Sequence, residues 1–351
     1  MTKRFLVTGG AGFIGSALVR HLIDNSPHSV LAVDKITYAA NLMSLSTVKS
    51  SARYQFAHLD ICDIDGLNRL FDTFMPNVVV HLAAETHVDR SIDGPATFVE
   101  TNIRGTFVLL QAALRHYQSL SRTKRSEFRF HHVSTDEVFG SLDPKIRCTE
   151  SSQYSPSSPY AATKAASDHL VHAWHRTFGL PAVISICSNN YGPRQFPEKL
   201  IPLTILNCAE CKKLLVYGDG LHVRDWVYVD DHVKALMLVA DKGVIGRTYA
   251  VGGDKEWTNI AVIKTICSLM DELAPNRQIG KHEALIRFDV DRPGHDRRHA
   301  IEARRISEEL GWKPIETLKT GLRKTVEWYL ANPTWWEHAR SRVYTGQRLG
   351  L

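Results

Sequence analysis

The stretch VTGGAGFIG, residues 7–15, decides the fold expected for this chain of 351 residues. It follows the apolar run RFLVTG and carries Gly9, Gly12 and Gly15, and Gly10, Gly12 and Gly15 also fit GxGxxG. Glycines at these positions permit a tight turn and close approach of the backbone to a pyrophosphate. The helix expected from Phe13 would point its first N–H groups at that charge. Because a strand precedes the motif and an amphipathic helix follows it, the stretch predicts a dinucleotide site.

A carboxylate further along selects the dinucleotide. The run SVLAVD ends in Asp34, about twenty residues beyond the glycines, where it would bond the adenosine ribose and repel a 2′-phosphate. The sequence therefore predicts NAD rather than NADP. DIC, at Asp60–Cys62, follows the third expected strand, and HLAAET, at His81–Thr86, follows the fourth. Ligands of an open parallel sheet bind beyond the carboxyl ends of its strands, so both stretches are expected to face the cofactor.

Short apolar runs alternate with longer helical patterns through the first half of the chain. The expected strands are RFLVTG, SVLAVD, YQFAHL, NVVVHL, FRFHHVS and AVISIC, and expected helices include residues 13–24, 96–116 and 160–178. This alternation predicts an α/β fold with a doubly wound parallel (Rossmann) sheet. The pattern changes near Asn189. We expect an NAD-binding domain at residues 1–188, with a return segment near 225–253, and a smaller, discontinuous α/β substrate-binding domain at 189–351.

Composition narrows the class of protein. Hydrophobic residues make up 44% and charged residues 23% of the chain, which is ordinary for a soluble globular protein. No apolar run is long enough for a membrane span, and no signal peptide is apparent, so we expect a cytoplasmic protein. The net charge of +6 is scattered, which does not favour nucleic acid as a partner. The lone CxxC at Cys208 and Cys211 lacks the second pair that a zinc site would need, so no metal is expected.

Two short stretches carry candidate chemistry. VSTDEVFG, residues 133–140, places Asp136 and Glu137 side by side just past a strand, as either a solvated turn or an acid and a base. In SPYAATKAASDHL, Tyr160 and Lys164 are four residues apart, which puts both on one face of a helix. A lysine ammonium beside a phenol would lower the pKa of the phenol, so that Tyr160 could take a proton from a substrate hydroxyl while a hydride leaves for NAD.

These motifs together resemble the extended short-chain dehydrogenase/reductase family. Within this family, long stretches of the sequence look like those of the dTDP-glucose 4,6-dehydratases, from Lys3 to about Trp336. These stretches are AAETHVDRSI, HHVSTDEVFG, SNNYGPRQFPEKLIPL and DRPGHDRR, together with KAASDHLV followed by AWHRTFGLP, and VYGDG followed by HVRDW. YAATK stands where the family usually has YSASK, and this difference leaves Tyr160 and Lys164 intact.

The resemblance implies a lyase that removes water from dTDP-glucose as a step toward deoxysugars of the rhamnose type. Tyr160, with Thr135 bonding the same hydroxyl and Lys164 beside it, would assist oxidation at C4 of the sugar. Glu137 would then take the C5 proton and Asp136, protonated, would release the C6 hydroxyl as water. Hydride would finally return to C6. Desolvation and the neighbouring carboxylate would raise the pKa of Asp136, as an acid at neutral pH requires.

The resemblance also implies the remaining contacts. The expected cofactor-binding residues are Gly9, Gly12, Phe13, Ile14, Gly15, Asp34, Lys35, Ile36, Thr37, Asp60, Ile61, Leu82, Ala83, Ala84, Thr86, Thr101, Tyr160, Lys164 and Asn190. The expected substrate-binding residues are Thr86, Thr135, Asn189, Lys199, Leu200, Val216, Tyr217, Arg224, Asn259, Asp291, Arg292, Pro293, Gly294 and His295. Among these, Arg224 and His295 suit a diphosphate. The stretch containing His295 would otherwise be an ordinary charged loop.

Three alternatives stay open at this point. An NAD-dependent nucleotide-sugar 4-epimerase shares the fold, the tyrosine and the lysine, but has no use for an acid and a base after Thr135. A 4,6-dehydratase acting on another nucleoside-diphosphate glucose would need only a few changes in the pocket. A dinucleotide-binding sensor without activity would be expected to have lost Tyr160, Lys164, Asp136 or Glu137. The family also pairs two helices of each subunit, so we expect a homodimer through residues 96–116 and 160–178.

Overall fold

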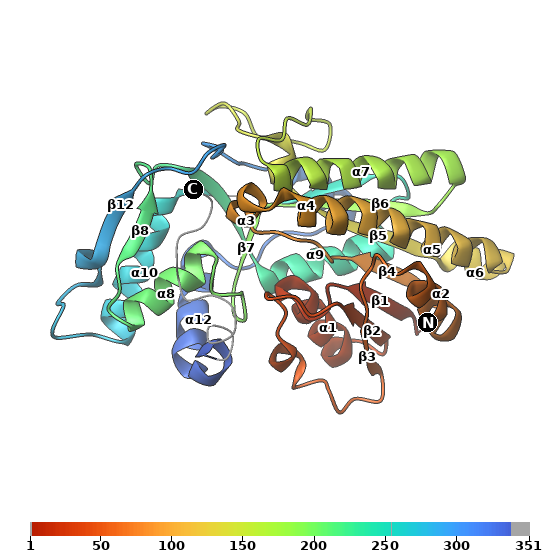
Figure 1. Cartoon of the computed structure of the whole chain (residues 1–351), viewed down its shortest axis with the longest axis horizontal. Coiled ribbons are helices and arrows are strands. Elements are labelled where there is room, and N and C mark those ends of the chain that lie inside the picture. Colours follow the sequence, from red (N-terminus) through yellow and green to blue (C-terminus); the bar gives the residue numbers. More distant parts are fainter. Residues whose placement is uncertain (1, 254, 338–351) are drawn as a thin grey trace.

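The computed structural model describes residues 2–253 and 255–337, and its largest element is a parallel sheet of seven strands (Figure 1). The strand order is β10-β6-β5-β4-β1-β2-β3. The bounds are β1 Arg4–Thr8, β2 Ser29–Asp34, β3 Tyr54–His58, β4 Val78–His81, β5 Arg129–Thr135, β6 Ala182–Cys187 and β10 Thr248–Val251. The order reverses direction beside β1, as in a doubly wound sheet. The expected fold is confirmed.

Side chains alternate between two cores, one on each face of this sheet. Phe5 and Val7 of β1 point into one core, with α1 (Phe13–Asn25) and α9 (Val229–Lys242), whereas Leu6 lies in the other. The second core includes residues of α2 (Ile64–Phe74), α5 (Gly105–Ser119) and α7 (Pro159–Phe178). Both cores contain fully buried Val, Leu and Phe side chains. The near-continuous apolar strands of the sequence are therefore explained by burial on both sheet faces.

The helix expected over residues 96–116 is interrupted. It consists of α4 (Pro95–Phe98), the π-helical turn η2 (Val99–Arg104) and α5. Asn102, in the turn, accepts from the backbone N–H of Glu85 at 2.8 Å and donates to Thr163 Oγ1 at 2.9 Å. These bonds tie the turn to the loop after β4 and to α7. A π turn inside a helix often marks a functional site, and Thr101 of this turn faces a cavity described below.

Smaller sheets and a third core form the rest of the described chain. A three-stranded sheet has the order β11-β9-β7, and β8 pairs with β12. The third core is rich in aromatic side chains and includes Trp226, Tyr329 and Trp335. The strands are β7 Asn189–Tyr191, β8 Leu214–Tyr217, β9 Val223–Tyr228, β11 Glu256–Thr258 and β12 Ile286–Asp289, and the helices around them are α8 Leu200–Ala209, α10 Asn259–Leu273 and α12 Leu318–Ala331. The short helices are η1 Leu42–Leu45, α3 Val88–Asp93, α6 Arg122–Glu127, η3 Asp136–Phe139, η4 His282–Leu285 and α11 Arg304–Leu310.

The return of the chain to the large sheet begins with α9. β9 belongs to the three-stranded sheet, whereas α9 packs on α1 and β10 pairs in parallel with β6. Of the return segment expected near residues 225–253, the part before Val229 therefore lies in the smaller sheet. The domain boundary at residue 188 stays an interpretation, and residues 338–351 of the expected second domain lie outside the described residues.

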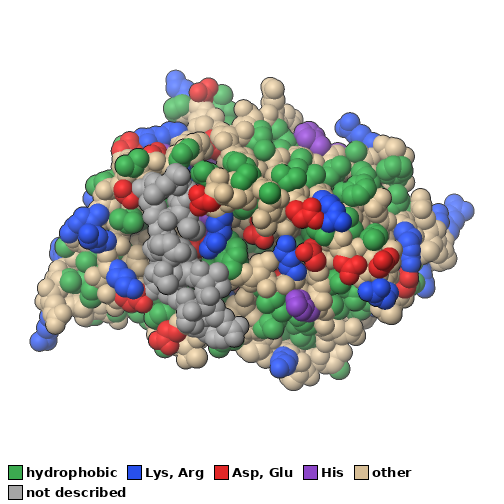
Figure 2. Space-filling model, viewed as in Figure 1, with side chains coloured by type: hydrophobic (Ala, Val, Ile, Leu, Met, Phe, Trp, Pro, Cys, Tyr) green, Lys and Arg blue, Asp and Glu red, His purple; other side chains and the backbone are tan. Residues whose placement is uncertain are grey.

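The surface shows no large field of one charge on the face in Figure 2, where Lys and Arg are interspersed with Asp and Glu. Within residues 2–253 and 255–337, no helix combines the length and the apolar character needed to cross a bilayer.

Replacing Leu6 by Ala tests the two-core arrangement, because Leu6 is fully buried in the middle of β1. We expect the free energy of unfolding to fall by about 2–5 kcal/mol, from lost burial and the cavity left behind. Leu221→Ala is the matched control, since Leu221 is 48% exposed, and should change stability by at most about 0.5 kcal/mol. Urea unfolding followed by circular dichroism measures both, and equal effects would contradict the assignment.

Candidate active site

The glycine turn brings backbone against backbone at the end of β1. Gly9 has φ of +69°, and a Cβ there would lie 2.8 Å from the backbone nitrogen of Ala83. A Cβ on Gly15 would lie 2.0 Å from the carbonyl oxygen of Gly9. Gly12 is the N-cap of α1, so no side chain covers the first N–H groups of the helix. The turn is thus a cradle that only glycine permits, with helix donors facing outward as a pyrophosphate requires.

Asp34 closes the same cradle from the end of β2. Its carboxylate accepts from the backbone N–H of Ala11 at 3.0 Å and of Ile36 at 2.8 Å. Burial raises the pKa of Asp34, while these two backbone donors act against the rise. Next to it, Lys35 donates to Thr101 Oγ1 at 2.8 Å. The acid is therefore held rigidly at the rim of the cavity, where a ribose would lie.

One cavity collects most of the expected cofactor contacts. The expected residues that line it are Gly9, Gly12, Phe13, Ile14, Gly15, Asp34, Lys35, Thr37, Ile61, Leu82, Ala83, Ala84, Thr86, Thr101, Tyr160, Lys164 and Asn190. Ile36 and Asp60 are the exceptions. Ile36 adopts a positive φ of 54° and is 38% exposed, and the carboxylate of Asp60 accepts from the backbone N–H of Cys62. The glycine turn, the acid beside it and the lining shared with the expected cofactor contacts together fit NAD.

The acidic pair stands on a 3₁₀ turn directly after β5. Asp136 is 2% exposed, and its Oδ2 has no hydrogen-bond partner among the described residues. Burial, with Glu137 and Asp225 nearby, raises the pKa of Asp136 well above its usual range. The backbone N–H of Glu137 donates to Thr135 Oγ1 at 3.3 Å, which caps the turn. Asp136 is therefore a buried carboxyl group with a raised pKa, which suits a proton donor, and not part of a solvated turn. Its role as the acid stays a prediction.

Tyr160 and Lys164 both line the cofactor cavity. Burial, and after it the charge of Glu137, raise the pKa of Tyr160 above its usual value, and a hydrogen bond with Thr135 acts against them. Lys164 Nζ donates to the carbonyl oxygen of Val133 at 2.8 Å. That Lys164 lowers the pKa of Tyr160 when NAD is bound stays a prediction.

A second cavity adjoins the first. Thr86, Glu137, Asn189, Glu198 and Lys199 line both cavities, so Glu137 stands at their junction. The expected substrate residues that line the second cavity are Thr86, Asn189, Lys199, Leu200, Val216, Tyr217, Arg224, Asn259, Arg292 and His295. Thr135 lines the first cavity. Asp291, Pro293 and Gly294 belong to the loop that carries Arg292 and His295, but they do not line the cavity.

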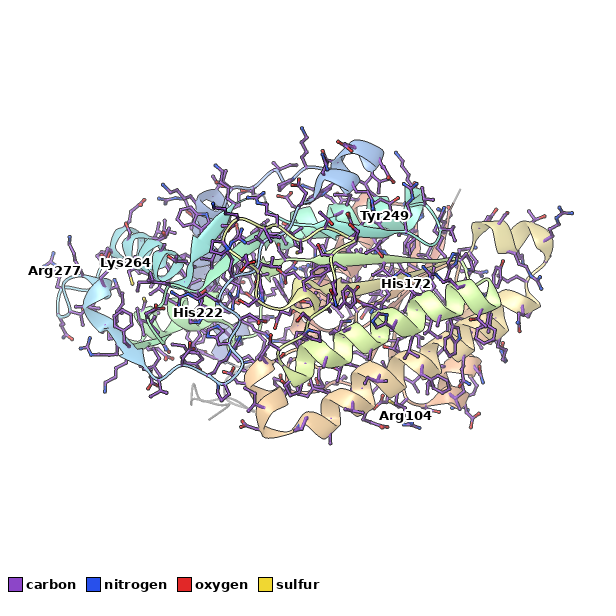
Figure 3. All side chains as sticks on the ribbon, turned by 90° about the horizontal axis from the view of Figure 1, so that it is seen from above. Arg104, His172, His222, Tyr249, Lys264 and Arg277 are labelled. Atoms are coloured by element: carbon purple, nitrogen blue, oxygen red, sulfur yellow. The ribbon has the colours of Figure 1, made fainter. Side chains whose placement is uncertain are left out.

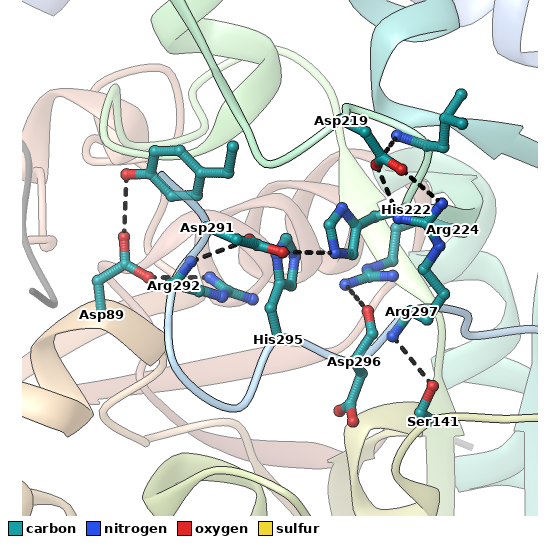
Figure 4. Close-up of polar contacts among 12 residues, drawn as sticks. Asp89, Ser141, Asp219, His222, Arg224, Asp291, Arg292, His295, Asp296 and Arg297 are labelled. Carbon is teal, nitrogen blue, oxygen red and sulfur yellow. Dashed lines mark hydrogen bonds and ion pairs between the residues drawn. The ribbon is translucent and has the colours of Figure 1, made fainter. Parts of the chain in front are cut away.

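Two cationic side chains that line the second cavity are held by polar contacts (Figure 4). Arg224 is 5% exposed and donates to the carbonyl oxygens of Val223 and Asp296, each at 2.8 Å. Arg292 donates to Asp89 Oδ1 at 2.9 Å. Burial lowers the pKa of Arg224, with Glu137 acting in the opposite direction. Two preoriented guanidinium groups suit a diphosphate.

His222, Asp291 and His295 form a compact group beside these arginines, with donor atoms within 4.8 Å of one another. The imidazoles stack at 3.7 Å, and Asp291 lies 3.1 Å from His222 Nε2 and 2.6 Å from His295 Nδ1. Burial, and after it the positive charges of Arg292 and Arg224, lower the pKa of His295 to about 3, and the same charges would repel a metal ion. The group is better explained as the support of the loop that presents Arg292 and His295.

Sequence reasoning missed Glu198. Its carboxylate accepts from Tyr38 O–H at 3.0 Å and from Arg90 Nε at 3.1 Å, and the guanidinium of Arg90 lies 3.9 Å from the centre of the Tyr38 ring. Glu198 faces both cavities and joins the loop after β2 to the segment before α8. The signal available was its position beside Lys199 in the word FPEKL, within the stretch used for the resemblance.

The chain is similar in sequence and in fold to sugar-nucleotide enzymes over almost its whole length. Residues 6–325 match the family model described as GDP-mannose 4,6 dehydratase. The dTDP-glucose 4,6-dehydratase of Shigella flexneri is 55% identical over 350 residues, covering 97% of this chain and 96% of the relative. DesIV, a dTDP-glucose 4,6-dehydratase from Streptomyces venezuelae crystallised with NAD, has a TM-score of 0.87 at 43% identity, covering 96% of this chain and 99% of its own. A UDP-glucose 4-epimerase from Thermotoga maritima has a TM-score of 0.82 at 28% identity, covering 94% and 99%.

Gly15→Ala tests the glycine cradle. The new methyl group would lie 2.0 Å from the carbonyl oxygen of Gly9, so the turn must open and we expect NAD affinity to fall by about tenfold or more. Gly94→Ala is the control, because the nearest atom to its Cβ lies 3.9 Å away. Isothermal titration with NAD measures both, and unchanged affinity in Gly15→Ala would contradict the site.

Proposed function

Because the chain belongs to the dTDP-glucose 4,6-dehydratase family of extended short-chain dehydrogenases/reductases, we propose that it converts dTDP-glucose to dTDP-4-keto-6-deoxyglucose with NAD as cofactor. The product would serve deoxysugar synthesis. The cytoplasmic location expected from the sequence stays a prediction.

The environment of Asp136 carries this proposal. A carboxyl group with a raised pKa and a free Oδ2 is available to donate a proton. Glu137 follows it in the chain and stands where the two cavities meet. Elimination of water across two adjacent carbons needs an acid at one carbon and a base at the other. A 4-epimerase, which shares this fold, needs neither.

NAD, when bound, would supply the hydride acceptor for C4 of the sugar and the hydride donor for C6. The glycine turn and the first N–H groups of α1 would hold its pyrophosphate, and Asp34 its ribose. Tyr160, in its phenolate form, would take the proton of the C4 hydroxyl, and Thr135, hydrogen-bonded to Tyr160, would orient the same hydroxyl. The resulting 4-ketone acidifies the proton on C5.

Elimination then uses the two carboxyl groups. Glu137 takes the C5 proton, and Asp136 gives its proton to the C6 hydroxyl, which leaves as water. During reduction at C6, Glu137 would give a proton back to C5, and net transfer of one proton from Tyr160 to Asp136 would restore both groups, so that one water is lost and no net oxidation occurs. Arg224 and Arg292, which line the second cavity, would hold the diphosphate during these steps.

We also propose a homodimer through α5 and α7, which lie side by side on one face of the sheet (Figure 3). Phe107 and Phe178 are 36% and 48% exposed, and Val99 before α5 is 50% exposed. The rings of Phe107 and Phe178 both contact Trp174, which makes one apolar surface. Such a surface is typical of an interface between protein chains.

The deciding experiment is incubation of the holoenzyme with dTDP-glucose in deuterated water, followed by mass spectrometry and NMR. We expect a product one water lighter with deuterium at C5, because Glu137 exchanges its proton with solvent before returning it. An unchanged mass with a galactose epimer would indicate a 4-epimerase instead. Turnover of UDP-glucose but not of dTDP-glucose would overturn only the assignment of thymine as the nucleotide base of the substrate.

Two variants separate the roles of the pair within this experiment. Asp136→Asn should lower kcat by about 10²- to 10⁴-fold and still permit deuterium exchange at C5, whereas Glu137→Gln should abolish the exchange. Asp143→Asn, an exposed carboxyl on the following loop, is the control and should keep full activity. Loss of exchange in Asp136→Asn would contradict the assignment of the two roles.

Phe107→Glu tests the assembly. We expect the wild type to have a dimeric mass by light scattering and the variant to shift toward the monomer, because a charge would be buried in the interface. Phe288→Glu is the control, since Phe288 is 61% exposed on β12, in the two-stranded sheet that β12 forms with β8. A monomeric wild type at micromolar concentration would contradict the homodimer.

A further inference from the structure

Lys164 lies in a dry interior where an ammonium group is unstable. The residue is 5% exposed, and burial lowers its pKa. One hydrogen bond, to the carbonyl oxygen of Val133 at 2.8 Å, does not neutralise its charge. Removing a cation from water is costly unless an opposite charge lies close. The role of Lys164 beside Tyr160 depends on that charge, so a counter-ion is required.

Asp168, one helical turn further along α7, meets this requirement. It is fully buried, and its Oδ2 accepts from Ser134 Oγ at 2.7 Å and from Tyr154 O–H at 2.9 Å. Its Oδ1 lies 3.1 Å from His132 Nε2, and the same nitrogen lies 3.5 Å from Lys164 Nζ. The ammonium and the carboxylate are therefore separated by a single imidazole nitrogen. Two hydroxyl donors on one oxygen favour the ionised form of the acid.

We propose that Asp168 is the buried counter-ion that keeps Lys164 in its ammonium form, and that it thereby acts as a positioning residue for proton transfer at Tyr160. Burial lowers the pKa of Lys164 and raises that of Asp168, and each group is the largest influence that opposes this shift in the other. The proposal rests on the proposed function only in the role that it gives to Tyr160.

The spacing along α7 decides what loss of Asp168 would do to Tyr160. Lys164 is four residues from Tyr160 and Asp168 is eight, which correspond to about 6 Å and about 12 Å along the helix. Without Asp168, a neutral Lys164 would remove the nearer positive charge, and the pKa of Tyr160 would rise. If Lys164 instead stayed charged, loss of the distant negative charge would lower that pKa. The direction in which the pKa of Tyr160 changes therefore distinguishes a neutral from a charged Lys164 in the variant.

Other ionisable groups face this pair. His132 and His131 come from β5, His81 from β4 and Cys187 from β6, while Tyr160 and His172 lie on α7 itself. Burial lowers the pKa values of the four histidines, so they are neutral at pH 7. Burial raises the pKa of Cys187 to about 12. Within the described chain, Asp168 is therefore the negative partner available to Lys164 at neutral pH.

The test is the ionisation of Tyr160 in the NAD-bound protein with Asp168→Asn, read from phenolate absorbance as the difference from the same protein carrying Tyr160→Phe. We expect the pKa of Tyr160 to rise by about one unit or more, and the acid limb of the kcat profile to move to higher pH by a similar amount, about tenfold in rate per unit. The absorbance needs no substrate, so failure of the proposed function would leave this result intact. A fall in the pKa of Tyr160, or no change, would overturn the proposal.

Two comparisons distinguish charge from structure. Tyr154→Phe removes one hydrogen bond to the same oxygen of Asp168 but no charge, so it should leave the pKa of Tyr160 and the pH profile in place. In a Lys164→Met background, Asp168→Asn should no longer change the pKa of Tyr160, because the charge that it supports is gone. If Asp168→Asn alone does not fold, the comparison of Lys164→Met with the double variant Lys164→Met/Asp168→Asn still tests whether Asp168 acts through Lys164. A persistent effect there would assign Asp168 a purely structural role.

Discussion

The parallel register of β1, β4, β5 and β6 is the constraint on which the site depends. Thr8 pairs with His81, His81 pairs with His132, and Thr135 pairs with Cys187. β5 therefore continues for three residues past the end of β4. This extension carries Asp136 and Glu137 into the lining of the cofactor cavity, and Glu137 also lines the second cavity. The glycine turn follows β1 at the same edge of the sheet, where the backbone of Gly9 lies against that of Leu82 and Ala83.

Burial sets the chemistry of the groups gathered at that edge. Asp136, Tyr160, Lys164 and Asp168 all lose water, and burial is the largest cause of the pKa shift of each. Desolvation favours the neutral form of each group, so it opposes ionisation of the two acids and the phenol and destabilises the ammonium. Among the described residues, Asp136 lacks a hydrogen-bond partner at Oδ2, whereas Asp168 has hydroxyl donors and a lysine. The same physical effect thus leaves one carboxyl group as an acid and makes another a counter-ion.

The shared architecture limits what the fold alone can say about the reaction. A UDP-glucose 4-epimerase superimposes on this chain nearly as well as DesIV does. Both chemistries begin with oxidation at C4, so the sheet, the glycine turn and the tyrosine serve either. The environment of two adjacent residues after β5 favours dehydration. Function in this fold is therefore decided by a few side chains at the strand ends.

The sequence by itself determined the doubly wound sheet, the NAD cradle and the identity of the acidic pair, because these follow from local glycine patterns, alternation and adjacent residues. Tertiary structure alone decided that Glu137 stands between two cavities, that Glu198 joins them, and that the chain returns to the large sheet at α9 and not at β9. It also decided how deeply Asp136, Tyr160 and Lys164 are buried. The physical reason is desolvation: how much water a group loses, and which charge replaces it, depends on segments such as β5 and α7 that meet only in the folded chain.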